Sequence, residues 1–266
     1  KLPWKEMDID VVVEATGFFI TYEKAKAHLD AGAKRVVISA PAKDEPETSG
    51  VKGATVLMGV NDGMLATCEI TSNASCTTNA ASPMVAILDE AIGIERALLN
   101  TVHAYTASQS LVDSPSKKAS TEEWRDGRAA AANIIPASTG AAIAVTKAYP
   151  KLVGKFDGMA IRVPVPVGSI VDVTFVASRA TSVEEVDNAL KVAAVSERWR
   201  GIFAVTEEPL VSSDIIGATF ASIADLSYTL VADGTLVKVL AWYDNEMGYT
   251  HTLVEHVVAF GKTVTI

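Results

Sequence analysis

Short apolar runs alternate with amphipathic stretches through the first part of the chain. Asp10–Ala15 and Arg35–Ala40 predict strands, with a helical pattern over residues 22–33 between them. Further short strands are expected at residues 55–59 and 68–71. Strand, helix and strand at this spacing indicate a βαβ unit with a right-handed crossover, and therefore a parallel α/β sheet.

The pattern changes further along the chain. Arg96–Thr106 predicts a strand, and the polar stretch Ala107–Arg128 predicts a long loop, of a length that is usually functional. Ala129–Tyr149 is rich in alanine and predicts helix, apart from a break at residues 136–140.

Strands dominate most of the remaining sequence. They are expected over residues 158–179 and again up to Tyr243, with a helix over Val183–Ala194 and a hairpin turn at Asp233-Gly234. Strands clustered in this way predict an antiparallel sheet in an α+β second domain. Residues 247–260 return to helical spacing and predict a closing helix.

Cys76 lies where a predicted strand gives way to a predicted helix. The alternating run Ala66–Ile70 precedes it, and apolar residues at helical spacing follow it. Unpaired N–H groups at a helix start favour a thiolate, so we expect a lowered pKa for Cys76 and a place for an oxyanion. Pro83 suits a first turn better than an interior, which predicts a late start or a kink. Most free cysteines are buried and inert, but the short polar side chains of Ser72–Ala80 favour a nucleophile.

His103 is the candidate base among the four histidines. It lies on a predicted strand, whereas His28, His251 and His256 are expected to be structural or solvated. A Cys–His pair is the minimal activated thiol, because the imidazole takes the proton and later serves as acid or base. A single strand histidine is more often a satisfied core residue, and sequence separation alone does not bring it to Cys76.

Hydroxyl groups, a helix N-terminus and one arginine form a second, scattered set. An oxyanion or phosphate is bound by such groups. An ordinary N-cap and a surface arginine account for the same residues, and from the residues alone this simpler interpretation is preferred. The set comprises Thr77, Thr106, Ser138, Thr139, Gly140 and Arg162.

Composition and charge exclude several classes of protein. The 266 residues allow one large domain or two, and the net charge of −9 argues against a nucleic-acid-binding surface. No apolar run approaches the length of a transmembrane helix, and no signal peptide opens the chain. Cys68 and Cys76 cannot build a disulfide framework, which indicates a reducing compartment, with the cytoplasm as the default. No cysteine, histidine and carboxylate spacing matches a metal site.

Ser72–Asn79 (SNASCTTN) resembles the active-site signature of phosphorylating glyceraldehyde-3-phosphate dehydrogenases. The resemblance extends over essentially the whole chain, because many further motifs match in order. They are Val13–Gly17, Ile38–Pro41, Thr101–Thr106, Asn133–Pro136, Ser138–Gly140, Gly158–Ala160, Arg162–Pro164 and Trp242–Glu246.

The resemblance implies a fold and a reaction. The fold is α/β plus α+β: a partial, doubly wound Rossmann-like domain at residues 1–75, completed by a closing helix at 244–266, and an antiparallel-sheet catalytic domain at 76–243. The reaction is the NAD-dependent oxidative phosphorylation of glyceraldehyde 3-phosphate to 1,3-bisphosphoglycerate in glycolysis. Cys76 would attack the aldehyde to give a thiohemiacetal and then a thioester, with His103 as the base.

The resemblance also implies binding residues and partners. Anion-binding residues would be Ser75, Thr77, Thr139 and Gly140 on one side, and Thr106 and Arg162 on the other. Cofactor-binding residues would be Thr16, Gly17, Ser39, Asn245 and Tyr249. The cofactor would be NAD in preference to NADP, because Pro115 stands where NAD-preferring members tend to carry proline. The substrates would be glyceraldehyde 3-phosphate and inorganic phosphate, and the assembly a cytoplasmic homotetramer with no metal, nucleic acid or membrane partner.

Three features depart from the family pattern. The chain contains no G-x-G-x-x-G, and it opens at Lys1 without an initiator methionine, so we expect a truncated chain that binds NAD poorly. Ser108 stands where the family usually has aspartate. The loop 113–128 is altered, with Arg125-Asp126-Gly127-Arg128 in place of paired arginines and with Lys117-Lys118 and Glu122-Glu123 rearranged.

Three alternatives stay open from sequence. One is a related sugar-phosphate dehydrogenase, such as one acting on erythrose 4-phosphate, which Ser108 and the altered loop allow. Another is a non-catalytic fragment, which the missing glycine loop favours. A Cys–His hydrolase rests only on the Cys76–His103 pair and lacks an identifiable third group.

Overall fold

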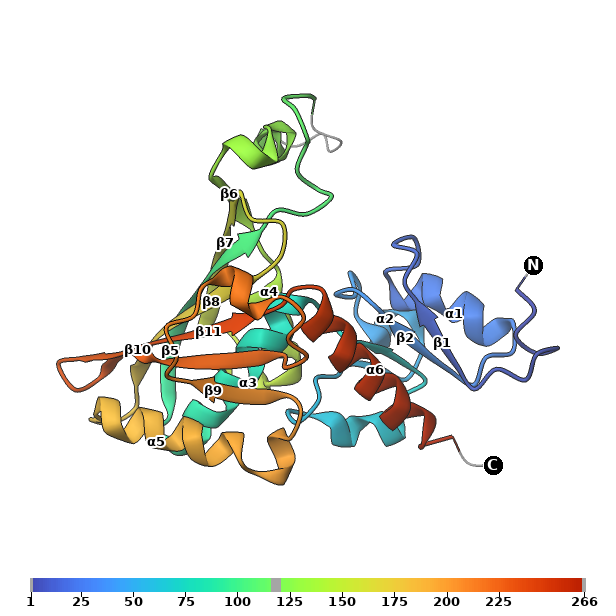
Figure 1. The fold of residues 1–266 in the computed structure, drawn as a ribbon. Coiled ribbons are helices and arrows are strands. Elements are labelled where there is room, and N and C mark those ends of the chain that lie inside the picture. Colours follow the sequence, from blue (N-terminus) through green and yellow to red (C-terminus); the bar gives the residue numbers. More distant parts are fainter. Residues whose placement is uncertain (1, 116–120, 265–266) are drawn as a thin grey trace.

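Two sheets organise the chain. The computed structural model describes residues 2–115 and 121–264 and shows a small sheet and a large sheet joined through two helices (Figure 1). One of these helices, α3 (Cys76–Ala91), follows the small sheet and packs on the large one. The other, α6 (Met247–Gly261), leaves the large sheet and packs back on the small one.

The small sheet is parallel and has helices on both faces. Its strands are ordered β1 (Val11–Glu14), β2 (Arg35–Ile38), β4 (Ile70–Ser72) and β3 (Gly53–Thr55). The crossover from β1 to β2 is α1 (Tyr22–Asp30), and α2 (Pro46–Ser49) precedes β3.

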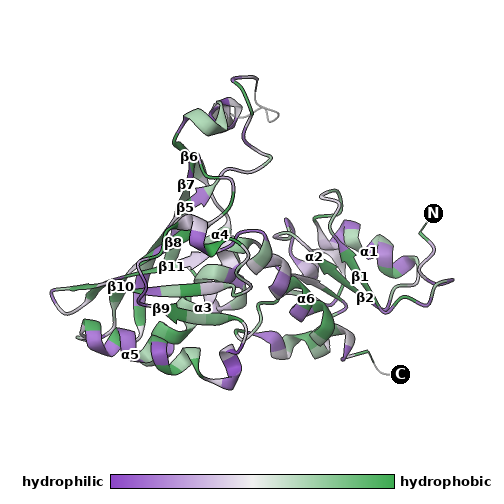
Figure 2. Ribbon diagram, in the orientation of Figure 1, coloured by the Kyte–Doolittle hydropathy of each residue, from purple (hydrophilic) through white to green (hydrophobic). Residues whose placement is uncertain are grey.

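Alternation along β2 explains the two cores of this sheet. Val36 and Ile38 pack against Tyr22 of α1, whereas Val37 faces the other way and packs against Phe260 of α6. Helices therefore cover both faces, which confirms the predicted partial doubly wound architecture. Figure 2 shows the corresponding hydropathy pattern, with hydrophobic strands in the sheet and hydrophilic residues on α1.

The large sheet has seven strands in the order β6-β7-β5-β8-β11-β10-β9. The strands are β5 (Ile94–Ala104), β6 (Ile135–Ser138), β7 (Phe156–Val163), β8 (Ser169–Ala177), β9 (Phe203–Thr206), β10 (Ser222–Ala232) and β11 (Leu236–Tyr243). The antiparallel character predicted for this domain holds for most neighbours, but β5–β7 and β9–β10 run parallel. Those two pairs are joined by long connections, so a tight hairpin does not impose an antiparallel pairing on them.

One face of the large sheet is covered by three helices: α3, α4 (Ala141–Ala148) and α5 (Val183–Ala194). The core there includes Met84 and Leu88 of α3 packed with Val173 and Phe175 of β8. The helix predicted at Val183–Ala194 is confirmed with those bounds, and Ser182 caps it by accepting from Glu185 N.

Several local predictions are wrong. The strand expected at residues 55–59 is only Gly53–Thr55, because the Asn61 side chain accepts from Leu57 N and donates to Thr55 O and so holds a turn. Residues 62–67 form a 3₁₀ helix, so the alternating run before Cys76 becomes strand only at Ile70.

The alanine-rich region also differs from its prediction. Residues 130–132 form a single 3₁₀ turn, and the expected break at 136–140 contains β6. Pro136 is tolerated there because β6 is an edge strand. Helix α3 does not start late: it begins at Cys76 and contains Pro83, and the kink expected at Pro83 stays a prediction.

The expected turn at Asp233-Gly234 is confirmed, since both residues have positive φ angles, 49° and 67°. In the long loop, residues 121–127 form a 3₁₀ helix. Lys117-Lys118 lie outside the described residues, as do the side chains of Glu122-Glu123. The domain boundaries at 75/76 and 243/244 stay a prediction.

Candidate active site

Cys76 is the first residue of α3 and follows a tightly held turn. Ser75 caps the helix, and its hydroxyl accepts from Thr78 N at 3.2 Å. The Asn79 amide donates to the carbonyls of Asn73 and Ser75 at 2.8 and 3.0 Å. The turn is therefore held by short polar side chains that can bond their own backbone.

The structure brings Cys76 and His103 together. Cys76 Sγ lies 3.4 Å from His103 Nε2, and the imidazole is almost fully buried on β5. His103 Nδ1 lies 2.6 Å from Ala104 O. A carbonyl only accepts, so this contact favours the proton on Nδ1 and leaves the Nε2 lone pair toward the thiol, whereas Arg162 Nη1, which only donates, lies against the same Nδ1 and favours the other tautomer.

The electrostatics keep both groups neutral at pH 7. Burial raises the pKa of the Cys76 thiol, and this outweighs the lowering by Thr77 hydrogen bonds and by the Arg162 charge. Burial, followed by the Arg162 charge, lowers the pKa of His103 from 6.5 to about 4. The expectation of a lowered thiol pKa is therefore wrong, because desolvation exceeds the effect of the helix N-terminus. The backbone N–H groups of Cys76 and Thr77 still face the sulfur.

Arg162 lies on β7 directly across the parallel ladder from His103. Its Nη1 lies against His103 Nδ1 and donates to Ala104 O at 3.3 Å. Its buried Nε has no hydrogen-bond partner among the described residues. A guanidinium with a spare buried donor beside the His103 imidazole fits an anion, since buried donors are normally paired.

Tyr243 is a site residue that sequence reasoning missed. Its hydroxyl lies 2.9 Å from Thr77 Oγ1 and 2.8 Å from Thr101 Oγ1, and its ring packs edge-on against His103. The signal was present, because Tyr243 lies within the matched motif Trp242–Glu246. It orients the Thr77 side chain behind the cysteine.

The residues predicted for the two sides of the anion-binding site have different contacts. The Thr106 hydroxyl lies 2.9 Å from that of Ser108, and Thr106 N donates to Gln109 Oε1 at 2.9 Å. Thr139 and Gly140 lie at the start of α4, where Thr139 Oγ1 accepts from Ala141 N. Helix α4 packs against the turn before Cys76 through Ala144 and Ala74.

Two of the predicted cofactor-binding residues lie next to the catalytic turn. Ser39 follows β2, and its hydroxyl lies 3.1 Å from that of Tyr249 on α6. Tyr249 also donates to Ala74 O at 3.3 Å. Asn245 Oδ1 accepts from Gly168 N and from the Ser169 hydroxyl, both at 3.1 Å.

Thr16 and Gly17 lie further away, after β1, which β2 separates from β4. Glu14 holds this turn: Oε1 accepts from Thr16 N at 2.8 Å, and Oε2 lies 2.7 Å from His28 Nε2. Gly17 has φ +78°, and no atom lies within 4 Å of where a Cβ would be, so its backbone is open to a ligand.

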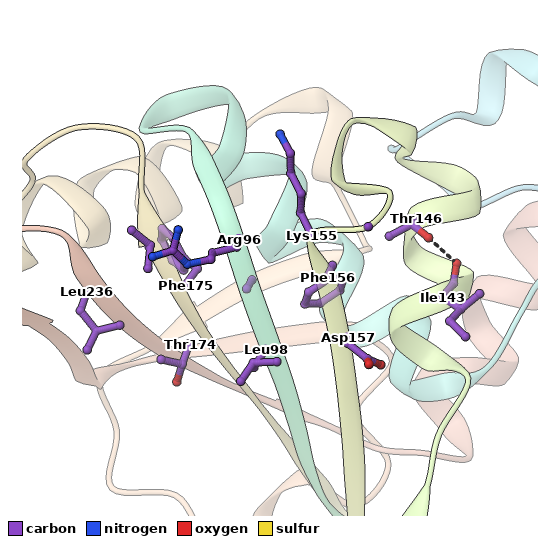
Figure 3. A pocket seen from close by; sticks show the side chains of 13 residues that line it. Arg96, Leu98, Ile143, Thr146, Lys155, Phe156, Asp157, Thr174, Phe175 and Leu236 are labelled. Atoms are coloured by element: carbon purple, nitrogen blue, oxygen red, sulfur yellow. Dashed lines mark hydrogen bonds between the residues drawn. The ribbon is translucent and has the colours of Figure 1, made fainter.

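A hollow of about 760 Å³ lies elsewhere, lined by residues of the large sheet and by Ile143 and Thr146 of α4. Figure 3 shows Leu98, Thr174 and Leu236 there, on three neighbouring strands. None of the predicted site residues lines it. Within residues 2–115 and 121–264, no trio of metal-binding side chains is grouped and no helix has the length and apolarity to cross a membrane.

Comparisons with known proteins agree with this geometry. Residues 75–245 match the family model described as glyceraldehyde 3-phosphate dehydrogenase, C-terminal domain. The chain is 48% identical over 264 residues to glyceraldehyde-3-phosphate dehydrogenase of Mycobacterium avium, covering 99% of this chain and 74% of the relative. It is 45% identical over 265 residues to glyceraldehyde-3-phosphate dehydrogenase B of Aspergillus oryzae, covering 98% and 75%.

A third relative, glyceraldehyde-3-phosphate dehydrogenase of Chlamydia muridarum, is 49% identical over 257 residues, which cover 96% of this chain and 73% of the relative. These matches confirm the resemblance seen in the sequence motifs. The chain belongs to the glyceraldehyde-3-phosphate dehydrogenase family, a family of NAD-dependent, phosphorylating oxidoreductases of glycolysis.

Proposed function

We propose that Cys76 and His103 carry out the oxidative phosphorylation of glyceraldehyde 3-phosphate to 1,3-bisphosphoglycerate. The observation that supports these roles is the 3.4 Å approach of Cys76 Sγ to His103 Nε2 at the N-terminus of α3. A nucleophile and its base at this distance can exchange a proton as a bond forms.

The first step joins the thiol to the aldehyde carbon. Sγ forms the C–S bond while its proton passes to His103 Nε2, and the carbonyl electron pair moves to the oxygen. The N–H groups of Cys76 and Thr77 at the helix start stabilise that negative oxygen. His103 then returns the proton to the oxygen and leaves a neutral thiohemiacetal on Cys76.

The second step oxidises the thiohemiacetal to a thioester. Bound NAD would supply the hydride acceptor for this oxidation. His103 removes the hydroxyl proton as the carbonyl re-forms, which it can do because its low pKa leaves it neutral at pH 7. Inorganic phosphate then attacks the thioester carbon, the C–S bond breaks, and His103 returns its proton to the departing sulfur, which releases the acyl phosphate and restores the neutral Cys76 thiol.

The anionic groups of substrate and phosphate need nearby donors. We assign them to Arg162 and Thr106 on one side and to Ser75, Thr77, Thr139 and Gly140 on the other. The buried Nε of Arg162, which has no partner within the part of the chain that the structure describes, supports the first assignment. The second is supported by the position of Thr139 and Gly140 at the start of α4, which packs against Ala74.

The cofactor would lie across the carboxyl ends of the small sheet. Ser39, Tyr249 and Asn245 would hold the nicotinamide end near Cys76, and Thr16 and Gly17 would line the site further along. The Ser39–Tyr249–Ala74 contacts support this, because they place both residues against the catalytic turn. NAD is proposed in preference to NADP.

The proposal also includes the oligomeric state and the cellular compartment. We infer a cytoplasmic homotetramer, and its self-association is supported by exposed apolar side chains of the large sheet, including Leu98 and Leu236. Analytical ultracentrifugation of the chain and of Leu98→Asp tests this. An unchanged monomer in both would contradict it.

The test of the reaction uses the purified chain with glyceraldehyde 3-phosphate, phosphate and NAD at a high concentration, because the chain contains no G-x-G-x-x-G and weak NAD binding is expected. We expect phosphate-dependent NAD reduction that Cys76→Ala abolishes and Cys68→Ala leaves unchanged, because Cys68 is buried away from His103. Retained phosphate-dependent reduction in Cys76→Ala would overturn the roles assigned. Erythrose 4-phosphate at equal concentration measures the aldehyde preference, and calorimetric titration with NAD measures binding separately from turnover.

A further inference from the structure

The turn before Cys76 contains a residue in a conformation that its side chain disfavours. Ala74 has φ +54°, in the left-handed region that glycine enters freely and alanine rarely does. Such a conformation persists only where surrounding contacts hold it. The chain reaches Cys76 two residues later, so the position of the thiol depends on this turn.

Helix α6 supplies contacts on both sides of this strained position. Tyr249 donates to the carbonyl of Ala74 at 3.3 Å. His256, seven residues further and thus on the same helix face, lies 3.0 Å through Nδ1 from Asn73 Oδ1. Both His256 and Asn73 are fully buried.

The hydrogen bonds of His256 define its tautomer. Asn73 Oδ1 can only accept, so Nδ1–H donates to it. His256 Nε2 lies 2.8 Å from Thr71 Oγ1 and accepts that hydroxyl proton. The neutral imidazole thus joins β4 to the catalytic turn, and burial lowers its pKa to about 4, which keeps it neutral at pH 7.

We propose that His256 is a positioning residue for Cys76: with Tyr249 it holds the left-handed turn at Ala74 and thereby keeps the thiol against His103. The Asn73 backbone carries the constraint onward, because its carbonyl accepts from Asn79 inside α3. This inference rests on the proposed role of Cys76 as the nucleophile. His256 itself does not touch the reacting atoms.

The experiment measures how strongly the reactivity of Cys76 depends on His103. Alkylation of Cys76 by iodoacetamide at pH 7 is followed by mass spectrometry, in the chain and in His103→Asn, so no cofactor is needed. We expect His103→Asn to slow alkylation by about tenfold or more, within the range of general-base effects. Each His256 variant is then measured with and without His103→Asn. The quantity compared between variants is the rate ratio, which is the alkylation rate without His103→Asn divided by the rate with it in the same His256 background.

His256→Gln is the main variant, because its amide reaches the Thr71 position but not Asn73. The ratio is expected to fall to near one in this background, whereas His256→Asn, which retains a donor near the Nδ1 position, is expected to keep most of it. Adding Ala74→Gly to His256→Gln is expected to restore the ratio, because glycine adopts positive φ without a clamp. His251→Gln, on the same helix, is the control and should change nothing.

The outcomes separate the two proposals. If the ratio is large in the parent chain and stays large in His256→Gln, the positioning role is overturned while the catalytic pair survives. If His103→Asn has no effect in the parent chain, the Cys76–His103 pair and the positioning role both fall. Thermal melting of each variant shows that it is folded. If His256→Gln lowers both the melting temperature and the rate ratio, and adding Ala74→Gly does not restore the ratio, His256 has a packing role alone and the positioning role is overturned.

Discussion

Arg162 and His103 are register partners on adjacent parallel strands, and the Arg162 guanidinium lies against the imidazole Nδ1. A positive charge at this position disfavours a second proton on the ring. It acts together with burial, which is the larger cause of the low His103 pKa. The same arginine that we assign to anion binding therefore also keeps the base able to accept a proton.

Removing the charge at Arg162 should raise the pKa of His103. In Arg162→Leu we expect the pKa to move upward from about 4 toward 6.5, because burial remains but the neighbouring cation is gone. An NMR titration of the His103 ring protons measures the shift. Arg162→Lys retains a cation and serves as the control; a His103 pKa that stays at about 4 in the leucine variant would show that burial alone sets it.

Loss of the Tyr243 hydroxyl should destabilise the chain. Tyr243→Phe leaves the hydroxyls of Thr77 and Thr101 without this partner in a buried site, which costs about 1–3 kcal/mol in the free energy of unfolding. Chemical denaturation measures the difference. Tyr228→Phe is the matched control, since Tyr228 is 58% exposed. Equal stability of the two variants would contradict the assigned hydrogen bonds.

Glu14 should stabilise the fold only when ionised. Burial opposes ionisation, but hydrogen bonds from Thr16 and His28 hold the Glu14 pKa below its usual value. A lowered folded-state pKa means that the contribution is present above the unfolded-state pKa and is lost as pH falls through the folded-state value. We expect Glu14→Gln to lower the free energy of unfolding by about 2 kcal/mol at pH 7 and by less at pH 3.

Denaturant titrations at the two pH values test the Glu14 prediction. Glu23→Gln, at an exposed position on α1, is the control and should show little change at either pH. A loss of stability in Glu14→Gln that is equal at both pH values would indicate a packing effect without an electrostatic one.

Buried histidines should make the fold less stable below neutrality. Burial lowers the pKa of His256 from 6.5 to about 4, so between these values the unfolded chain binds more protons than the folded chain. Stability should therefore fall as pH drops from 6.5 toward 4. His256→Asn removes this titration, and its stability should depend less steeply on pH over the same interval. An unchanged pH slope would show that His256 does not titrate differently in the two states.

Sequence reasoning predicted those features that depend on near neighbours in the chain. The change from strand to helix around Cys76 was expected from the apolar spacing, and the Ser75 hydroxyl, which accepts from a backbone N–H three residues ahead, starts the helix earlier than Pro83 suggested. The turn at Asp233-Gly234 follows from two residues that accept positive φ. Helix α5 has its predicted bounds because a serine cap and the spacing of its apolar residues are both local.

The motif resemblance identified most of the candidate site, but the contacts among its members were not readable from the chain. Tyr243 joins Thr77 and Thr101, residues far away in sequence, and no local pattern marks it as a partner of either. The thiol pKa was predicted in the wrong direction for the same reason. The helix N-terminus is visible in the sequence, whereas the burial that outweighs it is produced by the other elements packed around Cys76.

By itself, the sequence determined the order and type of most elements, the helix start that carries the cysteine, and the family to which the chain belongs, because motif order, caps and periodicity are properties of the linear chain. Only the tertiary structure decided which strands pair in parallel, which histidine reaches the thiol, and how α6 holds the turn at Ala74. Those outcomes depend on packing between segments that are distant in sequence. Desolvation and hydrogen bonding at these contacts are determined by residues that no local sequence pattern identifies.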